Sequence, residues 1–208
     1  MVIGLLAIAA IPTVTGVGQG YSAQKRQNAA AKEQEKFRMT AICDLDGQEC
    51  ETSFCVLKDK RLIVNLPGDD PVQGHFFCGY YFTYPSEEKH RGMVSTISED
   101  PPMLNWIYVN KDTHAVEFGG RKDTIDHVIG PWGWSEDETF LTLQGRKDDF
   151  VARWEEEEEE DDEGGEGRWV VYWDPGHEML AQVGDEDCMV VRLRRRPLLG
   201  MDSRYVRD

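Results

Sequence analysis

The sequence lacks the motifs by which the common enzyme classes are recognised. It contains no Gly-x-Ser-x-Gly nucleophile elbow, no His-Glu-x-x-His zinc motif, no phosphate-binding loop and no dinucleotide-binding glycine fingerprint. Its five histidines are scattered singly, whereas metal sites usually place at least one pair of ligands close together in the sequence. We therefore expect no cofactor and no metal site, and the balance leans against an enzyme.

Basic residues are also scarce. Lys and Arg number 23 against 39 Asp and Glu, which gives a net charge of −16. Nucleic acids are bound through a basic surface, so we expect no nucleic-acid partner. Ten of the acidic residues stand in residues 155–166. A protein partner, a membrane surface and a small-molecule ligand stay open as partners.

The cysteines form no recognisable framework. There are five, an odd number that cannot all pair within the chain, and no Cys-x-x-Cys occurs. We expect reduced thiols in or near strands; a disulfide set with one thiol left over is the alternative. No Asn-x-Ser/Thr sequon is present either, which is a weak point against passage through the secretory lumen.

Residues 1–18 are uncharged and mostly apolar, and three interpretations of residues 1–20 stay open. A membrane anchor is favoured, because the run is near the lower length limit for a bilayer-spanning helix. Lys25 and Arg26 follow it, so the positive-inside rule leaves the body in the cytoplasm. A secretory signal cleaved near Ala23 lacks the usual basic start and makes the protein secreted. A buried N-terminal segment is the third interpretation.

Residues 21–37 are rich in helix formers and have only alanines as an apolar face, which predicts an exposed helical spacer. From Phe37 onward apolar residues recur at every second position, the period of a half-buried strand. Turn signals such as Asp46-Gly47 separate these runs. The spacing predicts roughly eight to ten antiparallel strands. The fold class is therefore all-β, a single antiparallel barrel or curved β-sandwich over residues 38–197, preceded by a hydrophobic or helical arm.

Three aromatic segments dominate the predicted β-domain. Residues 74–84 carry apolar side chains on both faces, which predicts a central strand covered twice or part of a ligand-lined barrel, with ordinary core favoured. Residues 104–120 have the pattern of a β-hairpin. Residues 130–134, Gly-Pro-Trp-Gly-Trp, predict a tight turn whose rings close one end of the core.

The low-complexity acidic run is predicted to be a disordered loop, residues 155–167, because like charges repel one another and stay solvated. Trp154 and Trp169 flank it at the tip of a long hairpin, and we expect their strands to pair. The run is either a spacer or a docking site for a basic partner or for cations. Residues 192–196 form a basic cluster, interpreted as surface arginines, and residues 198–208 form a C-terminal tail.

Four stretches of the chain carry a family resemblance. They are the N-terminal run through residues 22–29 (Ser-Ala-Gln-Lys-Arg-Gln-Asn-Ala), residues 100–106 (Asp-Pro-Pro-Met-Leu-Asn-Trp), residues 112–116 (Asp-Thr-His-Ala-Val) and residues 130–134. Together they touch about half of the chain, and they resemble a family of small proteins of filamentous (ascomycete) fungi. The resemblance implies a shared fold and a fungal source. It implies no activity and no catalytic residues, because no function is known for that family.

Candidate site residues come from the aromatic segments and their neighbours. For catalysis the candidates are His75, His127 and Asp126, with the two imidazoles serving as acid and base in a β-barrel pocket. The candidates for ligand binding are Tyr81, Trp106, Trp132 and Trp134.

Three functional hypotheses follow. The favoured one is a non-enzymatic, membrane-associated interaction or scaffold module, with the arm as anchor, the β-domain as platform, and the charged loop and tail as contacts. The second is a small-molecule-binding or enzymatic β-barrel accessory to a biosynthetic pathway, which requires an aromatic-lined internal cavity with convergent polar groups. The third is a secreted binding protein, which requires cleavage near Ala23 and oxidised cysteines.

Overall fold

The computed structural model describes residues 34–45, 47–99, 102–156, 167–183 and 187–198. Its compact body begins at Lys36. Four predicted segments lie wholly or mostly outside the described residues: the anchor or signal (1–20), the helical spacer (21–37), the acidic loop (155–167) and the tail (198–208).

Strands make up most of the described body, which confirms the all-β prediction. Their bounds are β1 (Phe37–Leu45), β2 (Gln48–Phe54), β3 (Val56–Lys58), β4 (Arg61–Val64), β5 (His75–Phe76), β6 (Gly79–Thr83), β7 (Arg91–Glu99), β8 (Pro102–Val109), β9 (Val116–Gly119), β10 (Trp132–Trp134), β11 (Leu141–Leu143), β12 (Phe150–Glu156), β13 (Gly167–Trp173) and β14 (Cys188–Pro197). The helices of the described part are η1 (Arg121–Thr124), a 3-10 helix, and α2 (Glu178–Val183).

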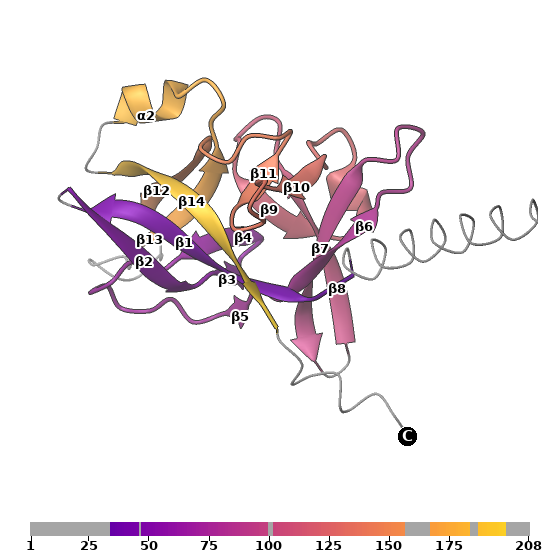
Figure 1. Cartoon of the computed structure of the whole chain (residues 1–208), viewed down its shortest axis with the longest axis horizontal. Helices are drawn as coiled ribbons and strands as arrows, with labels where there is room; N and C mark the ends of the chain where they lie inside the picture. Colours follow the sequence, from indigo (N-terminus) through magenta and orange to yellow (C-terminus); the bar gives the residue numbers. More distant parts are fainter. Residues whose placement is uncertain (1–33, 46, 100–101, 157–166, 184–186, 199–208) are drawn as a thin grey trace, which may run out of the picture. The chain divides into compact units, whose positions relative to one another are not determined.

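Nine of the described strands close into a ring (Figure 1). In spatial order they are β13, β12, β14, β1, β6, β7, β8, β9 and β4, and β13 pairs with β4 to complete the circuit. Each of these pairings is antiparallel. The structure is therefore the antiparallel barrel that the sequence predicts, rather than the sandwich.

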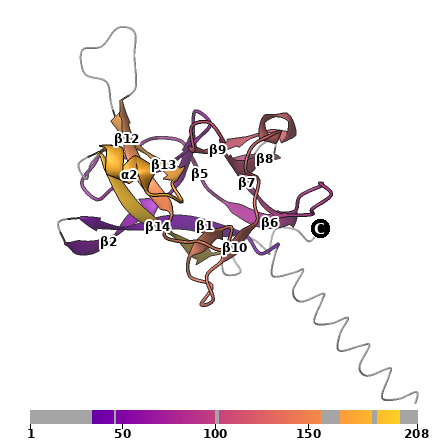
Figure 2. The same cartoon turned by 90° about the horizontal axis from the view of Figure 1, so that it is seen from above.

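Further strands are added to this ring. β2 pairs with β1, β3 with β4 and β5 with β3, and β10 and β11 form a separate two-stranded sheet. The β1–β2 hairpin lies at the left edge of the body in both views (Figure 1 and Figure 2). This hairpin therefore projects from the ring.

The β3–β4 hairpin shows how the sequence sets a turn. Asp59 and Lys60 connect the two strands and have φ angles of 48° and 62°. Two consecutive residues with positive φ are characteristic of a type I′ turn, whose twist matches that of the strands it joins. The turn places the Asp59 carboxylate beside β13, where it accepts a hydrogen bond from Arg168 (2.7 Å).

Large side chains fill the interior of the barrel. Along β1 the inward positions Phe37, Met39 and Ala41 are buried, as the period of two predicts. Trp132 of β10 is also buried, and its ring stacks parallel to that of Phe150 of β12 with centroids 6.2 Å apart. The centre of the ring is therefore a packed core.

The aromatic segment at residues 74–84 is not the single strand that its pattern predicts. It divides into β5 and β6 because the chain changes its partner strand. The Phe77 backbone N–H donates to the carbonyl of Cys55, next to β3 (2.9 Å), whereas the Cys78 backbone N–H donates to the hydroxyl of Ser95 in β7 (3.0 Å). Only one face carries buried side chains, and the side chains of the other face are half-buried or exposed. Phe77 and Tyr81 are buried, whereas Phe76 is 49% exposed.

Two further expectations are corrected. Trp132 and Trp134 belong to a strand, β10, which pairs with β11, rather than to a tight turn. The arginines of residues 192–196 are not all on the surface, since Arg195 is buried and its guanidinium carbon lies 4.9 Å from the centre of the Trp134 ring. The reason is that these residues continue β14, and alternate residues of a strand point inward.

Replacing Phe150 with alanine should lower the free energy of unfolding by about 3–5 kcal/mol, because the fully buried ring leaves a cavity against Trp132. Urea denaturation of the full chain measures the change. Phe76→Ala is the control, and its exposed ring should cost less than about 1 kcal/mol. Equal losses in the two variants would contradict a packed interior.

Candidate binding site at one end of the barrel

A cleft of about 500 Å³ opens at one end of the barrel, near the end of β4 and the start of β13. We call it the end cleft. One wall is the loop between β4 and β5, and the other is the β12–β13 hairpin. The lining residues are Lys58, Val64, Asn65, Asp69, Asp70, Pro71, Val72, Gln73, Trp154, Gly167, Arg168 and Trp169.

Two tryptophans form the apolar part of the end cleft. Trp154 of β12 and Trp169 of β13 are cross-strand partners, and their rings meet edge to face with centroids 5.4 Å apart. This is the strand pairing that the sequence predicts on either side of the acidic run. At Gly167 a Cβ would come within 2.0 Å of the Trp154 ring carbon Cζ2. Glycine at this position therefore lets the ring lie against the backbone.

Hydrogen bonds hold the loop that forms the other wall. The Trp169 Nε1–H donates to Asp69 Oδ2 (3.1 Å), and the Val72 backbone N–H donates to Asn65 Oδ1 (3.1 Å). Asn65 is buried directly after the end of β4. The Asp69 carboxylate is thus fixed at the edge of a tryptophan ring, and Asp70 beside it is exposed.

The charged residues that line the end cleft are two cations and two carboxylates, Asp69 and Asp70. Its two cations, Lys58 and Arg168, both approach Asp59, with N···O distances of 4.0 and 2.7 Å. Within the described residues, neither Asp69 nor Asp70 is part of an ion pair. In the sequence, the acidic run stands between β12 and β13. A cationic group that rests on the tryptophans and pairs with a carboxylate fits this arrangement.

Comparison with known proteins identifies the family. A family model described as a fungal beta-trefoil domain matches residues 16–198. The chain belongs to this family. The match spans the described body and confirms the resemblance to fungal proteins, and the family description agrees with the all-β architecture. No curated protein and no solved structure matches the chain.

The fungal beta-trefoil domain brings together two of the four predicted ligand-binding aromatics. The rings of Tyr81 and Trp134 lie 5.0 Å apart, and both pack against Phe37 at 5.7 and 4.7 Å. The Tyr81 hydroxyl donates to the carbonyl of Gly133 (2.7 Å). Burial raises the pKa of Tyr81 well above its ordinary value, despite two nearby arginines that lower it. Tyr81 is thus a satisfied core residue rather than a contact open to a ligand.

The other two aromatics lie elsewhere. Trp132 is buried against Phe150. Trp106 is on the outer face of β8, where its ring contacts Phe82 (5.3 Å) and Tyr84 (4.9 Å). The four predicted aromatics therefore do not line one cavity, and none of them lines the end cleft.

The predicted catalytic residues do not converge either. His75 begins β5, and its Nε2 lies 3.4 Å from a threonine hydroxyl of β7. His127 follows η1, stacks on Tyr108 of β8 (5.2 Å) and accepts the Lys111 backbone N–H at Nδ1 (3.2 Å). Asp126 is exposed. The threonine beside His75 is Thr96, which pairs with Leu104 of β8. Leu104 is four residues, or about 13 Å along the strand, from Tyr108, on which His127 stacks. The two histidines therefore do not form a pair, and no acid–base role is proposed.

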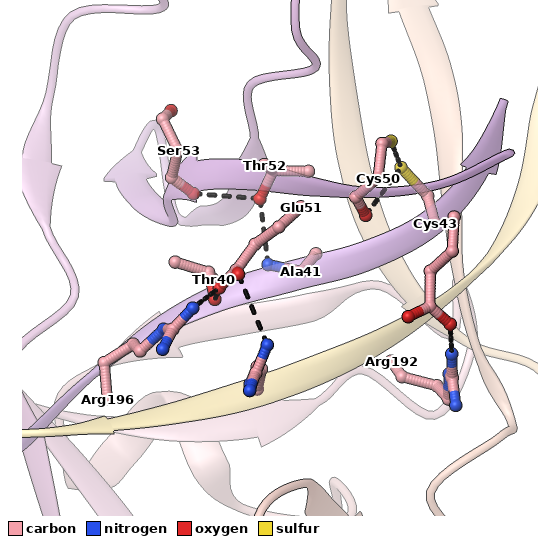
Figure 3. Close-up of polar contacts among 11 residues, drawn as sticks. Thr40, Ala41, Cys43, Cys50, Glu51, Thr52, Ser53, Arg192 and Arg196 are labelled. Atoms are coloured by element: carbon pink, nitrogen blue, oxygen red, sulfur yellow. Dashed lines mark hydrogen bonds and ion pairs between the residues drawn. The ribbon is translucent and has the colours of Figure 1, made fainter.

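A second charged surface crosses the outer face of β1 (Figure 3). Glu51 of β2 pairs with Arg194 (3.3 Å) and Arg196 of β14, and Glu49 pairs with Arg192 (2.5 Å). Both strands pair with β1, so these ion pairs tie β2 to β14 over it. In the sequence, both the glutamates and the arginines recur at every second position, which places each set on one face of its strand. Only the fold shows that the glutamates of β2 and the arginines of β14 lie side by side.

Glu51 is the centre of this network. Its Oε1 accepts a hydrogen bond from the Thr40 hydroxyl (2.5 Å). Partial burial raises the pKa of Glu51, but the hydrogen bonds from Thr40 and Arg196 and the charges of Arg196 and Arg194 outweigh burial, so the pKa lies below its ordinary value. A carboxylate of this kind stabilises the fold above its ordinary pKa, and the stabilisation is lost as pH falls through the lowered value.

Replacing Glu51 with glutamine should lower the free energy of unfolding by about 1 kcal/mol at neutral pH. The difference from wild type should begin to shrink as pH falls below about 4.5, the ordinary pKa, and should vanish below the lowered pKa of the folded state, where the wild-type carboxylate is protonated as well. Urea denaturation over a pH series measures this. Glu136→Gln, at an exposed position, should change stability by less than about 0.5 kcal/mol throughout. A loss independent of pH would contradict the ion-pair network.

Proposed function

We propose that this fungal beta-trefoil domain is a non-enzymatic interaction module that binds a basic segment of a partner protein in the end cleft. The observation that carries the proposal is the pair Trp154 and Trp169 beside the carboxylates of Asp69 and Asp70. Apolar rings next to carboxylates suit an arginine or lysine side chain, whose stem is apolar and whose tip is cationic.

A guest arginine gains from two kinds of contact in the end cleft. A guanidinium over a tryptophan ring contributes about 0.5–2 kcal/mol, and a charged hydrogen bond to Asp70 contributes about 1.5–3 kcal/mol. The net charge of −16 adds a longer-range attraction that speeds association and weakens as salt rises. Each contribution is modest, so useful affinity requires several basic side chains in one segment.

Packing supports binding at the surface rather than inside the barrel. Phe37, Trp132 and Phe150 occupy interior positions where a ligand-lined barrel needs an open cavity. In the end cleft the Asp69 carboxylate already accepts the Trp169 indole N–H. A wall held in fixed hydrogen bonds suits recognition, whereas acid–base catalysis requires a group positioned to exchange its proton with a substrate.

Binding of a fluorescently labelled hexa-arginine peptide to the full chain tests the proposal by fluorescence anisotropy at physiological ionic strength. Trp154→Ala and Asp70→Asn should each raise Kd by about tenfold, which corresponds to a loss of about 1.4 kcal/mol. Trp106→Ala is the matched control, because Trp106 is half-buried like Trp154 but lies outside the end cleft. It should leave Kd within about twofold.

A labelled hexaglutamate peptide is the second control and should not bind. If Trp154→Ala and Trp106→Ala bind the hexa-arginine peptide as tightly as wild type does, the attraction is a diffuse effect of net charge. The end cleft would then not be the recognition site.

We also propose the membrane association that the opening sequence favours, with the body on the cytoplasmic side. The supporting observation is the uncharged apolar run of residues 1–18, followed by Lys25 and Arg26. Among the described residues, no helix is both long enough and apolar enough to cross a bilayer. The proposed anchor lies outside those residues, so its support is the sequence.

The full chain should sediment with membranes, and a variant lacking residues 1–20 should remain in the supernatant. Cell fractionation followed by intact-mass measurement checks both expectations. Deleting residues 199–208 is the control and should leave sedimentation unchanged. Recovery from the medium of a chain cleaved near Ala23 would support the secreted binding protein instead.

A further inference from the structure

Two cysteines face each other across the β1–β2 hairpin. Cys43 and Cys50 are direct cross-strand partners, and their Sγ atoms are 2.8 Å apart (Figure 3). Cys43 is buried, whereas Cys50 is half-buried. The two sulfurs are therefore in contact, and Cys50 is the more exposed of the two residues.

The backbone already has the geometry that a disulfide requires. Directly opposed residues of antiparallel strands have Cα atoms about 4.5–5.5 Å apart, within the range of about 4.4–6.8 Å that a disulfide spans. Bonded sulfurs lie about 2.05 Å apart, so Cys43 and Cys50 need to approach by less than about 1 Å. A small side-chain rotation supplies that movement without a change of strand register.

The other three cysteines are less suited to pairing. Cys55 and Cys188 are fully buried, and Cys78 is half-buried at the break between β5 and β6. Burial raises the pKa of Cys55 to about 12, as it does for Cys43, so the 2.8 Å contact between sulfurs is what distinguishes the pair of Cys43 and Cys50. The fold therefore favours the pair in the β1–β2 hairpin.

We propose that Cys43 and Cys50 are a reversible disulfide site that fastens the edge strand β2 to the barrel. Among the described strands β2 pairs with β1 alone, so its attachment depends on one ladder and on the ion pairs of Glu49 and Glu51 with β14. A covalent link at Cys50, between these two glutamates, keeps both carboxylates near their arginines. Reduction releases the restraint and leaves the ring intact, because β2 is not part of it.

A small-molecule disulfide such as oxidised glutathione can supply the oxidation. The Cys50 thiol loses its proton and attacks one sulfur of that disulfide, which forms a mixed disulfide and releases one glutathione thiolate. The Cys43 thiol then loses its proton to solvent and attacks the Cys50 sulfur, which releases the second glutathione. The protein loses two electrons and two protons, and one glutathione disulfide becomes two thiols.

Exposure sets the order of these steps. Cys50 is the more exposed of the two residues, so a soluble disulfide should react there first. Burial, followed by the hydrogen bond and charge of Cys50, raises the pKa of the Cys43 thiol to about 12. Cys43 therefore reacts only with the sulfur that it already touches, where proximity favours the second step.

The test incubates the full chain with oxidised glutathione, blocks the remaining thiols with N-ethylmaleimide and digests the protein with trypsin and then a glutamate-specific protease. The second enzyme cuts after Glu49 and Glu51, so Cys43, Cys50 and Cys55 fall on separate peptides. We expect one linked pair, Cys43 with Cys50, in a monomeric chain whose Tm is about 5 °C above that of the reduced protein.

Cys43→Ala should leave Cys50 carrying one glutathione and should gain no thermal stability. Cys78→Ser is the matched control, because Cys78 is also half-buried, and it should keep both the link and the Tm shift. If Cys43→Ala does not fold, the wild-type peptide map still decides. The proposal is overturned if wild type yields both Cys43 and Cys50 as maleimide adducts, or links either one to Cys55 or Cys78.

Discussion

The fold depends on the pairing of β13 with β4, which closes the ring. The paired residues are Trp169 with Val64 and Val170 with Ile63. Closure removes the two long sheet edges that an open sheet would expose to other chains. The same pairing places Trp169 beside the last residue of β4, and the loop that leaves β4 then folds over the tryptophan. The end cleft is therefore a direct consequence of how the barrel closes.

The proposed functions combine strands of this ring with elements added to it, since Trp154 and Trp169 belong to β12 and β13 and Cys43 belongs to β1. The end cleft needs the loop after β4, which is held by the bond between Trp169 and Asp69, and the proposed disulfide needs β2, which pairs only with β1 among the described strands. Both additions are fastened by polar contacts, whereas the ring is stabilised by buried rings such as Phe150. Recognition and redox chemistry therefore share residues with the core, because Trp169 and Cys43 belong to its buried cluster.

Features that are decided by neighbours along the chain can be predicted from the sequence. The alternation after Phe37 and the pairing of Trp154 with Trp169 follow from the period of a strand and from hairpin connectivity. The break in residues 74–84 cannot be predicted in this way, because the chain leaves one partner strand for another at Cys78. No local pattern encodes that change.

The site itself could be predicted only in part. The sequence points to the tryptophans beside the acidic run, but the contact that completes the end cleft joins Trp169 to Asp69, 100 residues away. The sequence alone predicts Arg195 to be a surface residue, because arginine is usually exposed. In the fold its guanidinium lies against the ring of Trp134. The sequence predicts His75 and His127 as a pair because both lie near aromatic segments. In the fold His75 contacts β7 and His127 stacks on Tyr108 of β8.

One measurement tests the recognition surface most directly: the ¹H–¹⁵N spectrum of the six tryptophan indoles during titration with the basic peptide. A closed barrel that recognises its partner at the end cleft requires the signals of Trp154 and Trp169 to shift as the peptide binds. The signals that should stay in place are those of Trp106, Trp132, Trp134 and Trp173. Uniform shifts of all six, or a shift confined to Trp106, would contradict recognition at the end cleft.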